Sequence, residues 1–380
     1  MTQQQWGSPP AWGQGGGQWN QPPWSQGGGR WNQPQRGTRA PQALFGRAPQ
    51  GSGFGAPQLG QPYYAPGQFA PPPRRRRGGG LRSLLFAMML LALIGFVAMA
   101  GTNAANPSSQ NDAAYQNEDY RVPPPDKTPP ALPVPETYDE AEQLLTSNPL
   151  YRQTTPNPVR CNAQPINVAT ADDEQLDSHF ESLMECLVRV WQPPVEAAGF
   201  QIVRPTVTIY GKELTTRCGK SGVNAFYCSA DQQVYFSNQL PDYVTIVKRN
   251  KWAADVVMAH EFGHALQART ALLISSHALG QNSGSKSTEL ELSRRLETQA
   301  DCLSGMFMRS VSVSLGIEQS DAAGIEQTYA AVGDDTLSDD PSVVGNHGLA
   351  RSREYWGSTG LGTSAISKCN TFVASRSLVR

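Results

Sequence analysis

The chain has 380 residues and a formal net charge of −1, which is long enough for two domains. Its charge is uneven: nine Arg and no Lys or acidic residue occur up to Arg82, and 22 basic against 32 acidic residues follow. Five of the eight Trp lie in the first 31 residues, among Gly, Gln and Pro. This composition excludes a chain that is folded along its whole length, because the N-terminal Trp residues have too few apolar neighbours in the sequence to form a core.

Residues 1–80 are rich in Gly, Pro and Gln, and they contain loose repeats such as QWNQPPW and RWNQPQR. We expect a disordered tail, since this composition cannot offset the entropy lost on folding. Nucleic-acid binding by Arg and Trp is the alternative. The Arg residues are sparse before Arg74, and the cluster there fits membrane topology, so we expect no nucleic-acid partner.

Leu84–Gly101 is an uncharged run of 18 residues, long enough to cross a bilayer as a helix. We expect a single-pass transmembrane anchor over residues 81–101. Arg74–Arg77 and Arg82 precede it, which predicts a cytoplasmic N-terminus and an exported remainder at the cell membrane. A cleaved signal peptide ending near Ala98–Ala100 is the alternative.

All six cysteines follow this apolar run, which indicates disulfides in an oxidising compartment. No C-x-x-C occurs, so a four-cysteine zinc site is disfavoured. Cys218 and Cys228 are ten positions apart and are expected to join the loop that enters a hairpin. The other four are Cys161, Cys186, Cys302 and Cys369.

Residues 102–158 are rich in Pro, Asn and Asp, and we expect a semi-rigid stalk there. Residues 159–380 are expected to form one α+β domain with a small sheet and several helices. Apolar spacing predicts a helix over Asp173–Trp191, ended by Pro193 and Pro194. The other expected elements are strands at 201–210, 225–228 and 233–236 and helices at 252–273, 287–311 and 321–332, the last capped by Ser320.

His260-Glu261-Phe262-Gly263-His264 is an H-E-x-x-H inside the helix expected at 252–273. Residues four apart share a helix face, so both imidazoles can bind one zinc ion, with Glu261 beside them as a general base. The alternative is a buried helix whose two histidines are merely hydrogen-bonded. Metal binding gives both buried imidazoles a partner and is therefore preferred.

A hydrolytic zinc site needs a third protein ligand, and the long three-histidine form is excluded because Thr270 stands at its third position. An acidic ligand from the next helix remains, with Glu289, Glu291, Glu297 and Asp301 as candidates. We favour Glu297, with Asp301 one turn later as a partner for a ligand imidazole. His347 is either a donor to the developing oxyanion or a surface helix cap. His179 and His277 are expected at the surface.

The segments that carry a family resemblance are FYCSADQQVYF (226–236), HEFGHALQ (260–267), LETQADC (296–302), GDD (333–335), HG (347–348) and CNTF (369–372). In this order they resemble the bacterial neutral zinc metallopeptidases. The resemblance implies a zincin-like fold, one zinc per chain held by His260, His264 and Glu297, and Glu261 as the catalytic acid. It also suggests a Cys302–Cys369 disulfide, which leaves Cys161 with Cys186. The chain departs from the family after Gly348, so no role is assigned beyond it.

We therefore expect a membrane-anchored peptidase that acts on peptide or protein substrates by metal-assisted amide hydrolysis, with Glu261 removing a proton from the attacking water. The strand expected at 233–236 could pair with an extended substrate. The alternative is a catalytically weak or inactive zincin-like binding module of the cell envelope. The sequence does not indicate an oligomeric state.

Overall fold

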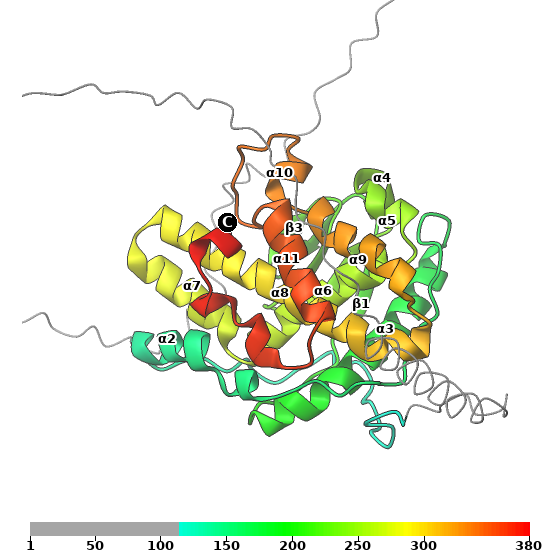
Figure 1. The fold of residues 1–380 in the computed structure, drawn as a ribbon, viewed down its shortest axis with the longest axis horizontal. Helices are drawn as coiled ribbons and strands as arrows, with labels where there is room; N and C mark the ends of the chain where they lie inside the picture. Colours follow the sequence, from blue (N-terminus) through cyan, green and yellow to red (C-terminus); the bar gives the residue numbers. More distant parts are fainter. Residues whose placement is uncertain (1–113) are drawn as a thin grey trace, which may run out of the picture. The chain divides into compact units, whose positions relative to one another are not determined.

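A computed structural model describes residues 114–380 (Figure 1). The expected tail, the apolar run at 84–101 and the start of the expected stalk lie outside the described residues. Among residues 114–380, no helix combines the length and the apolarity needed to cross a membrane. The helices of this part are α2 (Tyr138–Ser147), α3 (Asp173–Ala197), α4 (Leu240–Tyr243), α5 (Thr245–Arg249), α6 (Ala253–Arg269), α7 (Leu272–Ser283), α8 (Lys286–Leu315), α9 (Gln319–Ala331), α10 (Asp334–Leu337) and α11 (Ala350–Leu361).

The main sheet has three strands in the order β1-β5-β4, so the expected α+β class with a small sheet is confirmed. β5 (Gln233–Ser237) is central and fully buried; it pairs in parallel with β1 (Val207–Tyr210) and antiparallel with β4 (Ala225–Cys228). The expectation that residues 233–236 receive a substrate strand was wrong, because both sides of β5 are already paired. β2 (Leu214–Thr216) and β3 (Gly219–Ser221) form a separate hairpin that we did not predict.

Helix α3 continues through Pro193 and Pro194 to Ala197, although we expected the two prolines to end it. A proline at position 193 cannot donate to the carbonyl of Arg189 four residues earlier. The side chain of Asn117 donates to that carbonyl instead, at 2.7 Å. A residue from the segment before the helix therefore replaces the missing donor.

Residues 114–158 lie against the domain, whereas we expected them to form part of an extended stalk. Helix α2 buries Ala141 and Leu145, and the Asn148 side chain donates 2.9 Å to the carbonyl of Thr270. Leu150 and Tyr151 are buried in the same core. Apolar residues spaced along this Pro-rich segment thus give it enough buried surface to pack.

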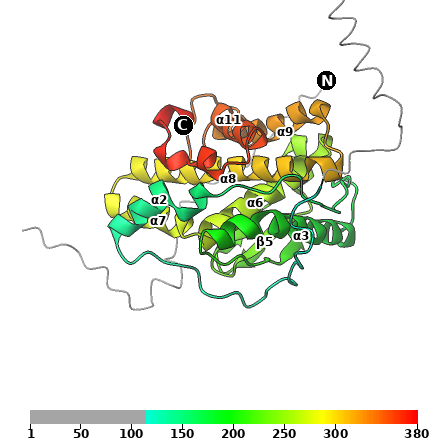
Figure 2. The ribbon, with the colours of Figure 1, turned by 60° about the horizontal axis from the view of Figure 1, so that its bottom comes forward.

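Helix α8 separates two layers of the domain (Figure 2). The sheet, α3 and α6 lie on one side of it, and α9 and α11 on the other. Helices α8 and α11 approach closely at glycines: a Cβ on Gly360 would lie 2.0 Å from the Cys302 carbonyl oxygen, and one on Gly305 would lie 2.3 Å from that of Gly357. Side chains near the middle of α8 therefore contact both layers.

The boundaries of two expected helices differ from the sequence prediction. The helix expected at 252–273 ends at Arg269, and Ala271, with a φ of 62°, turns the chain into α7. Helix α9 is capped by Glu318 together with Asp321, rather than by Ser320. In both cases a local feature outside the apolar pattern fixes the end of the helix: a left-handed residue after α6 and a pair of capping side chains before α9.

Candidate metal centre

Helix α6 brings its two motif histidines together on one face. The Nε2 atoms of His260 and His264 lie 3.1 Å apart, and both rings are largely buried. The helix is apolar on most sides and packs between α8 and β4, which explains the uninterrupted apolar residues before the motif. Burial lowers the pKa of His264 to about 4, so this imidazole is neutral near pH 7.

Helix α8 places Glu297 opposite the two imidazoles. Its Oε2 lies 3.4 Å from Nε2 of His260, and its Oε1 lies 3.5 Å from Nε2 of His264. Within residues 114–380, these three side chains form the one group of His, Cys, Asp and Glu whose donor atoms lie close enough to hold a metal. Glu289 pairs with Lys286 instead, and Glu291 with Arg295 and Arg376.

The spacing of these donors fits a zinc ion. Ligand atoms about 2.0–2.1 Å from a tetrahedral zinc lie roughly 3.3–3.4 Å from one another, close to the 3.1, 3.4 and 3.5 Å found here. Three protein ligands would leave a fourth position for water, as in catalytic zinc sites.

Hydrogen bonds behind the rings direct both Nε2 lone pairs to the same point. Nδ1 of His260 lies 2.9 Å from Oδ1 of Asp301, and Nδ1 of His264 lies 2.8 Å from Oε1 of Gln267. Gln267 donates its amide to the Leu296 carbonyl at 2.8 Å, so its oxygen faces the ring. Burial lowers the pKa of His260, but the Asp301 carboxylate raises it to about 10, so a metal would displace a proton there.

Glu261 lies beside this centre and is held by the sheet. The backbone N–H of Tyr227, on the edge strand β4, donates 2.9 Å to its Oε2. Burial raises the pKa of Glu261 to about 7, which suits a group that takes and returns a proton near neutral pH. The sequence did not reveal Tyr227 as a partner, because its contribution is a backbone group.

His347 lies in the loop between α10 and α11, and its side chain is 43% exposed. Its Nδ1 is 3.2 Å from Oδ1 of Asp334, whose Oδ2 also accepts the N–H groups of Gly345 and Gly348. The expected helix-cap role is wrong, since the residue at the N-terminal cap of α11 is Leu349. Burial lowers the pKa of His347, but the hydrogen bond to Asp334 and the charge of Glu297 together raise it by more. The pKa therefore lies above its usual value.

Arg353 of α11 reaches the same centre, although we assigned no role beyond Gly348. Its guanidinium forms two 2.8 Å contacts with the Asp301 carboxylate and lies 3.6 Å from Oε2 of Glu297. A carboxylate as buried as that of Asp301 is stabilised by a nearby cation, and that requirement could have predicted an Arg or Lys here. The sequence pattern around residue 353 does not identify which residue supplies it.

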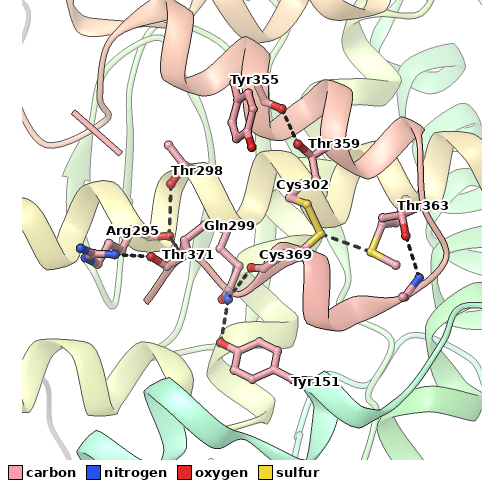
Figure 3. The surroundings of a disulfide bond; sticks show 12 residues. Tyr151, Arg295, Thr298, Gln299, Cys302, Tyr355, Thr359, Thr363, Cys369 and Thr371 are labelled. Atoms are coloured by element: carbon pink, nitrogen blue, oxygen red, sulfur yellow. Dashed lines mark hydrogen bonds between the residues drawn. A yellow bond between two sulfur atoms is a disulfide. The ribbon is translucent and has the colours of Figure 1, made fainter. Parts of the chain in front are cut away.

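A second network joins the back of His264 to the C-terminal segment. Figure 3 shows its part around Gln299, Tyr151 and the Cys302–Cys369 disulfide. Gln267 donates to Gln299 at 3.1 Å, and Gln299 donates to the Tyr151 hydroxyl and to the carbonyl of Cys369. Cys369 is bonded to Cys302, which directly follows Asp301 on α8. The disulfide therefore ties the C-terminal segment to the helix that carries Glu297 and Asp301.

The structure joins all six cysteines in the pairs named from the sequence: Cys161–Cys186, Cys218–Cys228 and Cys302–Cys369. The expectation for His179 was wrong, because its side chain is buried and lies 2.7 Å from Asp255 of α6. His179 is three residues after Leu176, on the buried face of α3, and Asp255 offsets the cost of burying it. His277 is exposed, as expected.

This fold and donor arrangement define a zinc-metallopeptidase-like domain. The family described as "Putative neutral zinc metallopeptidase" matches residues 140–372, and the chain belongs to that family. The uncharacterized protein YpfJ of Escherichia coli K12 is 30% identical over 198 residues, which cover 48% of this chain and 66% of that protein. An uncharacterized protein of Mycobacterium tuberculosis H37Rv is 27% identical over 207 residues, or 49% of this chain and 67% of that protein.

The aligned region thus spans slightly less than two thirds of the length of the E. coli relative. No solved structure matches the chain with significance. The matched family extends into α2, so it covers part of the segment that we expected to be a stalk.

Proposed function

We propose that this chain is a zinc-dependent peptidase with one zinc per chain, held by His260, His264 and Glu297. The observation that carries the proposal is that three donor side chains converge and that Glu261, a carboxylate that is not one of the ligands, is fixed beside them. A purely structural zinc site has four protein ligands and needs no such base. The zincin-like binding module is therefore the weaker alternative.

When bound, zinc would activate a water molecule and polarise the scissile carbonyl of a peptide substrate. Glu261 removes a proton from the attacking water and then returns it to the leaving amine. Its Oε2 is held by the Tyr227 N–H, which leaves Oε1 for the proton. Because burial raises the pKa of Glu261, the carboxyl can both accept and release this proton near neutral pH.

His347 is proposed as the donor to the oxyanion that develops in the reaction. Asp334 holds its Nδ1, so the Nε2–H of a protonated ring remains available, and the charge of the ring interacts with Glu297. A positioned donor of this kind is typically worth about 10²–10³ in kcat. Its partial exposure leaves the ring accessible to a substrate.

We also propose that the domain lies outside the cytoplasm, anchored by the apolar run at 84–101. The Arg cluster before that run and the three disulfides after it support this orientation. A reporter that is active only outside the cytoplasm, fused after residue 380, should be active. A silent fusion with an active cytoplasmic reporter at the same site would contradict the orientation.

The function is tested with the purified full chain in detergent. It should contain about one zinc per chain and cleave an unstructured protein substrate, and a chelator should abolish cleavage until zinc is restored. The variant Glu261→Gln serves as the matched control, because it should retain zinc and lose cleavage. Zinc binding without cleavage of a broad peptide library would favour the binding module.

A further inference from the structure

Arg353 is buried at the back of the metal centre, with its side chain only 4% exposed. We propose that Arg353 is a positioning residue for the metal site: it orients Asp301, and through Asp301 the ligand His260. This inference rests on the proposed zinc site. It adds a contribution from the C-terminal helix α11, which lies in the part of the chain beyond Gly348 to which we had assigned no role.

The guanidinium holds both oxygens of the Asp301 carboxylate. Nε lies 2.8 Å from Oδ2, and Nη2 lies 2.8 Å from Oδ1. A paired contact of this kind fixes the plane of the carboxylate as well as its position. A single lysine ammonium cannot reproduce it, because it is a point charge without the planar fork.

The fixed carboxylate in turn determines the orientation of His260. Oδ1 of Asp301 is shared between Nη2 of Arg353 and Nδ1 of His260, at 2.8 and 2.9 Å. The bond to Nδ1 selects the tautomer and the ring plane that direct Nε2 toward Glu297 and His264. A rotation of the Asp301 carboxylate would therefore turn the ring of His260 away from the shared point.

Close helix packing explains how Arg353 reaches this position. Where α11 crosses α8, Gly360 faces the Cys302 carbonyl and Gly305 faces the Gly357 carbonyl, with no space for a Cβ. The guanidinium also donates 3.2 Å to the carbonyl of Val332, at the end of α9. The side chain, carried by α11, is thus held by contacts with α8 and with the end of α9, which restrict it to the geometry that Asp301 needs.

The positive charge of Arg353 should lower the affinity for zinc, whereas its positioning of Asp301 should raise it. Nη2 lies 3.3 Å from Nδ1 of His260 and Nη1 lies 3.6 Å from Oε2 of Glu297, so the cation is close enough to repel a bound dication. Removing it would favour zinc electrostatically but release the Asp301 carboxylate. The direction of the change in zinc affinity therefore distinguishes positioning from charge repulsion.

The test compares zinc affinity in the full chain for Arg353→Met, Arg353→Lys and Arg351→Met, measured by competition with a chromogenic chelator. Arg351 is exposed on the same helix and serves as the matched control. We expect Arg353→Met to weaken zinc binding by about 10–100-fold, the usual effect of losing an outer partner of a ligand. Arg353→Lys should restore part of the affinity, and Arg351→Met should match the unchanged chain.

A second measurement separates positioning from a general loss of stability. The Co²⁺-substituted Arg353→Met chain should show an altered visible absorption spectrum, while its metal-free circular dichroism spectrum stays unchanged. In a double-mutant cycle, Arg353→Met should add little to Asp301→Asn, because both remove the same orientation. Should Arg353→Met fail to fold, the cycle is run with Arg353→Lys.

Unchanged or tighter zinc binding in Arg353→Met would overturn the inference, as would additive effects in the cycle. These measurements need no substrate. If the chain binds zinc but does not cleave peptides, the proposed peptidase function is wrong, and the positioning role of Arg353 is still tested. A chain that binds no zinc at all would overturn both proposals.

Discussion

Helices α6 and α11 contribute to the same centre in opposite ways. Helix α6 carries His260, Glu261 and His264 within five consecutive residues, and its spacing alone places them on neighbouring faces. Helix α11 carries one relevant residue, Arg353, among small and polar residues with little apolar pattern. The donors of the site are thus determined by local spacing, whereas their orientation depends on contacts between distant segments.

The largest effect expected on the α6–α8 side is that of Glu297→Ala. The variant removes one of three proposed ligands, so zinc affinity should fall by more than the roughly 10–100-fold typical of outer partners, and activity should be lost with it. Metal analysis after dialysis and chelator competition measure the loss. Glu289→Ala, near the start of the same helix, should retain full zinc content. The reverse pattern would show that α8 supplies a different ligand.

Glu261→Gln should affect the reaction and leave the metal in place. The amide keeps the size of the side chain but cannot accept a proton, and general-base catalysis is typically worth about 10²–10⁴-fold. We expect kcat to fall by that amount while zinc content stays near one per chain. Metal analysis and peptide cleavage on the same sample measure both quantities. Full activity in this variant would exclude Glu261 as the base.

The apolar residues of the sequence predicted the helices that cross the core. The expected helices at 173–191, 252–273 and 287–311 correspond to α3, α6 and α8; the buried residues of α3 recur at three or four positions, whereas α6 and the middle of α8 are buried on most sides. Helix α11 was missed because glycines replace large apolar residues on its buried face. Glycine has low helix propensity, so these residues do not predict a helix. Their role is to let α11 pack closely against α8, and that contact is visible only in the tertiary structure.

The same distinction applies to the site. His260, His264, Glu297 and Asp301 lie together as expected: the two residues on each helix are four apart and share a face, and the packing of α6 against α8 brings the two faces together. Gln267 and Arg353 were not assigned a role, since their partners lie on other helices. Tyr227 contributes a backbone N–H, which any residue except proline could supply.

Gly360→Ala tests the role of close packing between α8 and α11. The added Cβ would lie 2.0 Å from the Cys302 carbonyl oxygen, so the helices must separate. We expect a loss of about 1–3 kcal/mol in the free energy of unfolding, as for other overpacked sites, and weaker zinc binding as Arg353 moves. Urea unfolding of the metal-free chain and chelator competition measure the two effects.

Gly362→Ala provides the control for this comparison. Gly362 lies just after α11, and a Cβ there would make ordinary contacts at 3.5 Å or more. Its stability and zinc affinity should stay close to those of the unchanged chain. Equal effects of the two substitutions would mean that the close approach at Gly360 does not determine the position of Arg353.

The smallest effect is expected for Asp334→Asn, which removes the carboxylate partner of His347. The Asp334 carboxylate raises the pKa of His347 against the lowering effect of burial, so the substitution should lower that pKa. Because the pKa is raised in the folded chain, the pair stabilises the fold fully below the unfolded value of about 6.5, and less as pH rises through the folded pKa. The folded pKa of Asp334 is lowered, so its contribution is lost only as pH falls below about 4.

The stability difference between the unchanged chain and Asp334→Asn should therefore be larger at pH 5.5 than at pH 8.5, as measured by urea unfolding. NMR titration should show the lowered pKa directly, since the chain has only five histidines to assign. Asp339→Asn, an exposed substitution in the loop that carries His347, should change neither quantity. If the pKa of His347 is the same in Asp334→Asn as in the unchanged chain, Asp334 does not hold this imidazole in its protonated form. The raised pKa of His347 would then rest on Glu297, its other acidic neighbour, and Asp334 would have no role in keeping the proposed oxyanion donor protonated.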